Sequence, residues 1–162
     1  METMTENETL IWLFKHNIDN ENFINNYELK LSKKISVDSG FKNYLAKEIA
    51  SIYNENNILL YINEFGIWPS CENMYLFDGY RKSIGINNNI SEKPSHIISQ
   101  NENIELYCIL GMILYFFMGC IIIPINNQNE IINISHDEYL EVYIKHGIET
   151  NIILNKINQI TK

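Results

Sequence analysis

Apolar residues recur at helical spacing in two segments near the start of the chain. Residues 6–16 form a short amphipathic stretch, which predicts a helix with an apolar side made of Leu10, Ile11, Leu13 and Phe14. Residues 38–53 show the same period, with Asp38 or Ser39 as the N-cap. The residues between them have no clear period and are left unassigned. Ile58–Ile62 is a short apolar run before turn residues, and it predicts a strand.

The segment EFGIWPSCENMYLFDGYRKSIG, residues 64–85, turns the chain from this strand into a helix. Pro69 disfavours helical geometry for the residue before it, so we expect a corner at Trp68. Ser70 is a suitable N-cap, and Glu72 lies in the first turn, where the helix dipole favours a negative charge. The predicted helix ends at Gly85, and its apolar stripe is Met74, Leu76, Phe77, Tyr80 and Ile84.

Residues Leu106–Ile125 form an uncharged run that is long enough to span a bilayer. Gly119 and Pro124 interrupt this run, its flanks carry no nearby Lys or Arg, and its end is β-branched. We therefore predict a buried helix followed by a buried strand and expect no membrane span. A small membrane protein that spans at 106–125 is the alternative.

The last part of the chain predicts a hairpin and two helices. Residues 120–135 match a β-hairpin with its turn at Asn126–Asn129. Ser135 and Glu138 have the spacing of a capping box, which predicts a helix that ends at Gly147. Residues 148–160 form a final amphipathic run, and the polar residues 86–103 predict a loop.

Together these elements predict an α+β fold. We expect a single globular domain over residues 1–162, mainly helical, around a small sheet of about three strands that includes the hairpin near 120–135.

The composition favours a protein-binding role. The formal net charge is −8, with 20 acidic against 12 basic residues. Such a domain repels phosphate backbones and attracts a basic protein, so we expect a basic protein partner and no direct nucleic-acid binding. The charge could equally serve solubility alone. The odd number of cysteines without a C-x-x-C pair, and the polar acidic N-terminus, indicate a cytoplasmic protein.

The densest polar cluster is His136, Asp137, Glu138 and Glu141. It lacks the H-E-x-x-H spacing of a metal site, so no metal is expected. Three interpretations stay open: an exposed and capped helix start, an acidic patch that contacts a partner, and a catalytic group.

Two further groups invite a chemical interpretation. Cys71 lies near a predicted helix N-terminus, which can lower the pKa of a thiol, but no motif supplies a general base. Asp78 and Arg81 are spaced to pair across one helical turn. Arg81 is the only arginine in the chain, which hints at a specific carboxylate partner. No glycine-rich phosphate loop or nucleotide fingerprint occurs, so no cofactor is expected.

Two blocks of this sequence resemble a set of small, uncharacterised bacterial proteins. Those proteins carry a G-[IV]-W-P-S-x-E-N block before an Arg-containing helix and an I-S-H-D-E-[WY] block after a hairpin. The resemblance implies a common fold over roughly residues 58–145 and no established activity. It also implies that the blocks face one another, with Arg81 or Trp68 near Asp137 and Glu138. The matching residues are Gly66, Ile67, Trp68, Pro69, Ser70, Glu72, Asn73, Arg81 and Gly85, then Ile134, Ser135, His136, Asp137, Glu138 and Tyr139.

The favoured function is an acidic binding protein that neutralises a basic partner, as an immunity protein blocks a cognate bacterial toxin. One alternative is a phage-type inhibitor of a nucleic-acid-binding defence enzyme. Another is a small enzyme that uses Cys71 or the His136/Asp137/Glu138 cluster. No catalytic residue is assigned, and the residues expected to contact the partner are Trp68, Glu72, Asp78, Arg81, Asp137, Glu138 and Glu141.

Overall fold

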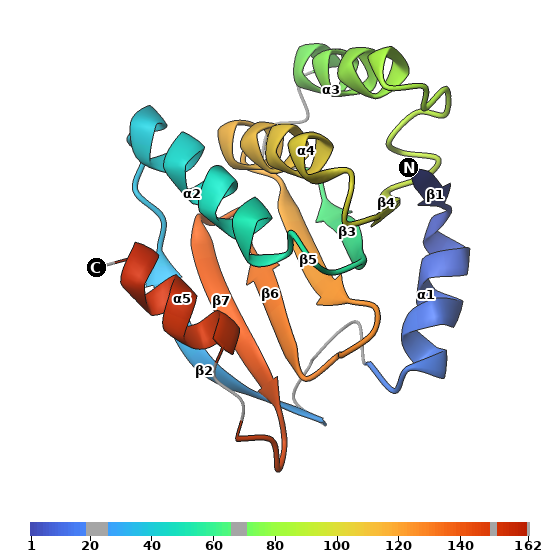
Figure 1. The fold of residues 1–162 in the computed structure, drawn as a ribbon. Helices are drawn as coiled ribbons and strands as arrows, with labels where there is room; N and C mark the ends of the chain where they lie inside the picture. Colours follow the sequence, from blue (N-terminus) through green and yellow to red (C-terminus); the bar gives the residue numbers. More distant parts are fainter. Residues whose placement is uncertain (19–25, 66–70, 150–151, 162) are drawn as a thin grey trace.

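The computed structural model describes residues 1–18, 26–65, 71–149 and 152–161, and its centre is a seven-stranded sheet within these residues (Figure 1). The helices are α1 (Glu6–Lys15), α2 (Ser39–Ile52), α3 (Cys71–Ser83), α4 (Asn103–Tyr115) and α5 (Ile152–Ile160). The strands are β1 (Glu2–Met4), β2 (Tyr27–Lys34), β3 (Ile58–Glu64), β4 (Ser95–Ile98), β5 (Gly119–Pro124), β6 (Glu130–Ile134) and β7 (Tyr139–Lys145).

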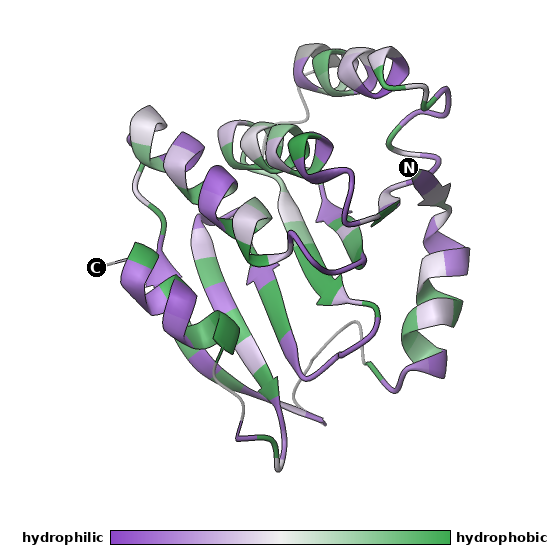
Figure 2. Cartoon of the chain, viewed as in Figure 1, coloured by the Kyte–Doolittle hydropathy of each residue, from purple (hydrophilic) through white to green (hydrophobic). Residues whose placement is uncertain are grey.

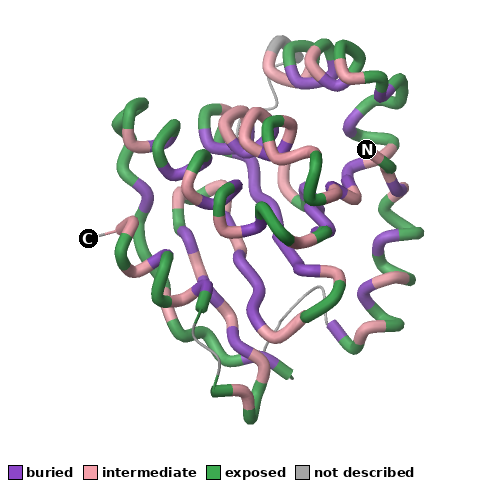
Figure 3. The backbone as a smooth tube through the Cα atoms, in the orientation of Figure 1, coloured by how far each residue is buried: buried purple, intermediate pink, exposed green. Residues whose placement is uncertain are grey.

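The strands lie in the order β1-β4-β3-β5-β6-β7-β2, and each described pair is antiparallel. Strand β3 is buried from Ile58 to Ile62, and β5 is buried along its whole length. A strand that is covered on both faces must be apolar at successive positions, which explains the run of isoleucines in β5. Figure 2 shows apolar residues along the central strands, and Figure 3 shows the same strands buried.

Each face of the sheet carries its own hydrophobic core. On one face, α2, α4 and α5 pack on alternate residues of the strands, such as Leu60, Ile122 and Val142. On the other face, Trp12 and Leu13 of α1 pack against Leu59, Tyr61 and Ile121, among others. Because side chains alternate along a strand, neighbouring residues belong to different cores.

The sequence pattern located several elements correctly. Helices α1, α2 and α3 lie where amphipathic spacing predicted them, and β3 contains the predicted strand. Residues Leu106–Ile125 hold most of α4 and the whole of β5, as expected from the change to β-branched residues. The hairpin of β5 and β6 and the C-terminal α5 also match the predictions. Among the described residues, no helix has both the length and the apolar character needed to cross a membrane.

The prediction of a mainly helical domain around about three strands was wrong. Four strands were missed: β1, β2, β4 and β7. β2 exposes both of its faces along most of its length, so its sequence lacks the alternation that marks a half-buried strand. Its place is decided by pairing with β7 from Tyr27 to Lys34. β1 and β4 are short, and β4 lies within the residues predicted to be a loop.

The predicted helix from Ser135 to Gly147 was also wrong, because this segment forms a tight turn and then β7. The Glu138 backbone has a φ of 64°, which a right-handed helix does not allow. The Ser135 N–H donates to the Tyr139 carbonyl at 2.9 Å and closes the turn between β6 and β7. Leu140, Val142 and Ile144 then alternate into the sheet's interior, a period that the helical interpretation overlooked.

Candidate functional site

The end of β3 and the turn between β6 and β7 are joined by a carboxylate and an imidazole. Nδ1 of His136 lies 2.6 Å from Oε2 of Glu64, and the His136 backbone N–H donates to the same oxygen at 3.2 Å. Nε2 of His136 lies 3.5 Å from Oδ1 of Asp137. The hydrogen bond to Glu64 raises the pKa of His136, because it favours the protonated ring. His136 therefore lies between two carboxylates at the surface.

Gly119 makes room for this contact. It is the partner of Glu64 in the pairing of β3 with β5, where the register shifts after Ile62. A Cβ at position 119 would collide with the carboxylate of Glu64 and would lie 2.9 Å from its Cβ. Cys120 points into the core beneath α2 and α4, so position 119 faces the opposite side of the sheet. Glu64 lies on the same side of the sheet and occupies the space that a side chain at position 119 would fill.

The outer residues of β7 continue this surface. Tyr139, Glu141 and Tyr143 alternate with the buried Leu140 and Val142, so they share the face of the sheet that is opposite α2, α4 and α5. Tyr139 is 40% exposed, while Glu141 and Tyr143 are half-buried. We call the group of Glu64, His136, Asp137, Tyr139, Glu141 and Tyr143 the acidic face.

The carboxylate of Glu141 is held in place by its neighbours. Its Oε2 accepts hydrogen bonds from Nδ2 of Asn133 and from the hydroxyl of Tyr143, both at 3.0 Å. Partial burial and this bond raise the pKa of Tyr143 to about 12, so the phenol stays protonated and continues to donate. Glu141 thus presents its remaining lone pairs from a fixed position on a strand.

Glu138 points away from the acidic face. Its Oε1 lies 2.8 Å from Nζ of Lys42 on α2, and that ammonium is almost fully buried. The same ammonium lies 4.0 Å from the centre of the Phe117 ring. A buried Lys needs such partners because desolvation of an unpaired charge is costly. Of the carboxylates predicted in this cluster, Glu138 is tied to the interior, while Asp137 is 67% exposed by side chain.

Asp78 and Arg81 are both buried and form the pair that their spacing predicted. Nη1 of Arg81 lies 3.4 Å from Oδ1 of Asp78, and Nη2 donates to the Lys93 carbonyl at 2.9 Å. Oδ1 of Asp78 also accepts the Ile90 N–H at 2.7 Å. These bonds hold α3 to the loop before β4. Arg81 is fully buried, so its side chain supports the fold at this position and does not lie on the acidic face.

The sequence-predicted site residues are therefore only partly brought together. Asp137 and Glu141 share the acidic face, whereas Trp68 and the side chains of Cys71 and Glu72 lie outside the described residues. The described partners of Arg81 are Asp78 and Lys93, not Asp137 or Glu138. Glu64, which contacts His136, precedes the first sequence block, and the start of that block lies outside the described residues, so the expectation that the two blocks face one another stays a prediction.

Sequence reasoning missed Glu64 and Gly119 as parts of this site. No local pattern marks them, because their roles depend on strand pairing between distant segments. Within the described ranges, no group of three or more His, Cys, Asp or Glu residues could hold a metal ion. No family model, curated protein or solved structure matches this chain.

Proposed function

We propose that this protein binds a basic protein partner through the acidic face and neutralises it, as an immunity protein blocks a bacterial toxin. The observation that carries the proposal is the gathering of Glu64, Asp137 and Glu141 beside two tyrosines on one sheet surface. Carboxylates of this kind attract cationic side chains, and tyrosine rings give a partner apolar contact area with a polar tip.

The overall charge supports the same proposal. A net charge of −8 produces a field that accelerates encounter with a positively charged protein, and salt screens this field over about 8–10 Å. A toxin that acts on nucleic acid needs a cationic surface for its substrate, and an acidic binder can cover that surface. The toxin is the partner class that best fits this chemistry.

The rigidity of the acidic face favours binding over a mere solubilising role. Glu141 is held by Asn133 and Tyr143, and Glu64 is held by His136. Side chains that are already ordered lose less conformational entropy on association, which improves affinity for the same contacts. A surface that serves only solubility has no need of such bonds between its charged groups.

The proposal is tested by capture of a partner and by matched charge changes. Tagged protein is incubated with lysate of its own cells, and captured proteins are identified by mass spectrometry after low-salt and high-salt washes. We expect one basic protein in stoichiometric amount, released by high salt, and we expect co-expression of this chain to relieve that protein's toxicity.

Two triple variants distinguish the effect of charges on the acidic face from the effect of the protein's net charge on association. Glu64→Gln, Asp137→Asn and Glu141→Gln together remove three charges from the face. The control, Glu2→Gln, Glu55→Gln and Glu149→Gln, removes three exposed charges elsewhere. At low salt we expect the first variant to slow association with the captured partner about tenfold and the control to slow it far less. Equal effects of the two variants on a folded protein would contradict the proposed site.

A further inference from the structure

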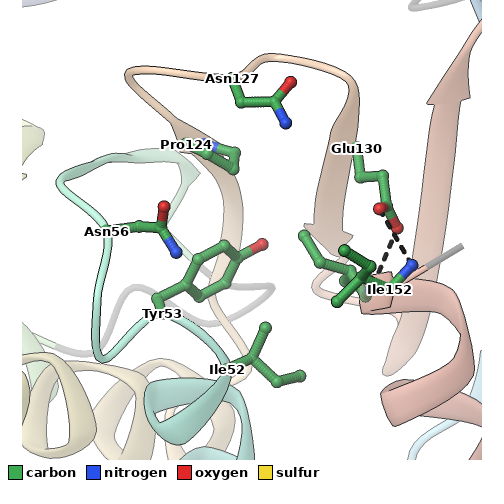
Figure 4. A pocket seen from close by; sticks show the side chains of 8 residues that line it. Ile52, Tyr53, Asn56, Pro124, Asn127, Glu130 and Ile152 are labelled. Carbon is green, nitrogen blue, oxygen red and sulfur yellow. Dashed lines mark hydrogen bonds between the residues drawn. The ribbon is translucent and has the colours of Figure 1, made fainter. Parts of the chain in front are cut away.

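A pocket of about 160 Å³ lies near the turn between β5 and β6, at the ends of these strands away from the contact of His136 with Glu64 (Figure 4). The last turn of α2, the loop after it, the turn between β5 and β6 and the first turn of α5 form its walls. Its volume is close to the roughly 150 Å³ of a protein cavity that holds benzene. The pocket therefore suits a ligand of about six non-hydrogen atoms.

The hydroxyl of Tyr53 is the unexplained group in this pocket. It is fully buried and has no hydrogen-bond partner within the described part of the chain. Figure 4 shows the Tyr53 side chain, from the residue that follows α2, pointing into the space that is bordered by Pro124, Asn127 and Glu130. A buried hydroxyl without a partner is unfavourable, and buried polar groups nearly always have one. A ligand that bonds to this oxygen would remove the cost.

Glu130 supplies a fixed carboxylate in the opposite wall. Its side chain is buried, and its oxygens accept the backbone N–H groups of Ile152, Ile153 and Leu154 at 3.2, 3.0 and 3.2 Å. These bonds satisfy the first backbone N–H groups of α5 and hold the carboxylate at the N-terminus of that helix. The carboxylate also contributes to a raised pKa of Tyr53, after the larger effect of burial, which indicates that the two groups are close.

The other lining residues narrow the class of ligand. Asn56 and Asn127 add carboxamide groups, and Ile52, Pro124 and Ile152 add apolar walls. The described lining residues contain one acid and no base. An ammonium group has three donors, which match a phenol oxygen, a carboxylate oxygen and an amide oxygen. A short alkyl chain matches the apolar walls.

We propose that this pocket binds a small primary amine, with its ammonium group between the Tyr53 hydroxyl and the Glu130 carboxylate and its alkyl part against the isoleucines. The site is separate from the acidic face, because Tyr53 and Ile153 belong to the core on the α2 and α5 side of the sheet, whereas Tyr143 packs on the other side. The proposal therefore stands or fails independently of partner binding.

The test is an NMR titration of ¹⁵N-labelled protein with n-propylammonium chloride, with 1-propanol and sodium chloride as probe controls. We expect saturable shifts of the amides of Tyr53, Glu130 and Ile153 with the ammonium probe. 1-Propanol, which keeps the alkyl chain and lacks the charge, should bind several-fold more weakly. Sodium chloride should cause no saturable shift at these amides.

Variants then assign the contacts. Tyr53→Phe should weaken n-propylammonium binding about fivefold to tenfold. Tyr44→Phe, which removes a hydroxyl from an exposed tyrosine of α2, should leave the binding of n-propylammonium unchanged. Glu130→Gln keeps an oxygen acceptor and should weaken the ammonium probe more than 1-propanol. If Glu130→Gln destabilises α5, comparison of Tyr53→Phe with Tyr44→Phe still tests whether the ammonium group bonds to the Tyr53 hydroxyl.

Three results would overturn the proposal. The first is the absence of saturable shifts in the wild-type protein with the ammonium probe. The second is equal affinity of wild type and Tyr53→Phe for that probe. The third is equal affinity for 1-propanol and n-propylammonium, which would exclude recognition of the charge.

Discussion

His136 and Glu64 are 72 positions apart in the chain, yet their side chains lie 2.6 Å apart. The contact ties the turn after β6 to the end of β3 and passes over Gly119 of the strand between them. Because the bond is partly exposed, its effect on the fold is modest, but it decides how charge is arranged on the acidic face.

Replacement of Glu64 by Gln should change how stability depends on pH. Folding raises the pKa of His136, so its bond to Glu64 stabilises the native state fully below the unfolded pKa of about 6.5. This stabilisation is lost as the pH rises through the higher folded pKa. The difference in unfolding free energy between wild type and Glu64→Gln should therefore shrink as the pH rises through that range.

Urea unfolding at several pH values and an NMR titration of His136 measure this effect. The His136 pKa should fall towards its ordinary value in Glu64→Gln. The exposed control Glu55→Gln should follow wild type at every pH. An unchanged His136 pKa in Glu64→Gln would show that the bond does not persist in solution.

Gly119→Ala should disturb the acidic face, whereas Gly111→Ala should not. A Cβ at 119 collides with Glu64, so we expect a loss of about 1–3 kcal/mol in unfolding free energy and a lower His136 pKa. Gly111 lies in α4 with no atom within 4 Å of the added Cβ, so alanine should be neutral or stabilise by about 0.5–1 kcal/mol. Denaturant unfolding of both variants compares them directly; equal stabilities would contradict the close approach at Gly119.

Arg81→Ala should strongly destabilise the protein, although Arg81 belongs to a helix at the surface. It leaves the buried Asp78 carboxylate without its cation and the Lys93 carbonyl without a donor, so we expect a loss of about 3–5 kcal/mol. In a double-mutant cycle, Asp78→Ala and Arg81→Ala together should cost less than the sum of the single changes. Thermal or urea unfolding of the four proteins provides the coupling energy, and additive losses would argue against a functioning pair.

Tyr53→Phe and Tyr27→Phe should differ in their effect on the unfolding free energy of the ligand-free protein. Both tyrosines are buried to the same extent, but the Tyr27 hydroxyl donates to the Gln128 carbonyl at 2.7 Å and the Tyr53 hydroxyl has no described partner. Loss of the Tyr27 bond should cost about 1 kcal/mol, while Tyr53→Phe should be neutral or stabilise by up to about 1 kcal/mol. Urea unfolding of both variants checks this, and a destabilised Tyr53→Phe would mean that the hydroxyl is already paired.

Local pattern was sufficient for the elements whose burial is periodic. Asp38 caps α2, and the buried Leu45, Ala46, Ile49 and Ala50 repeat at the helical period, so this helix is specified within its own segment. Thr5 caps α1 at the predicted place, but only Leu13 of its predicted apolar side is buried, and Leu10, Ile11 and Phe14 are exposed. The β5–β6 hairpin is similarly local, since β-branched residues flank a polar turn at 126–129. The sequence by itself therefore determined most helices, the central strands and the acidic net charge.

Only the tertiary structure decided the size of the sheet and the location of the site. Tyr139, Leu140, Tyr143 and Ile144 satisfy a helical period, but pairing of β7 with both β6 and β2 imposes alternation and makes a strand. Burial of Arg81 and the contact of Glu64 with His136 depend on segments that are far apart in the chain. Such contacts leave no local signature, because their free energy arises only when the strands pair and both faces of the sheet are covered.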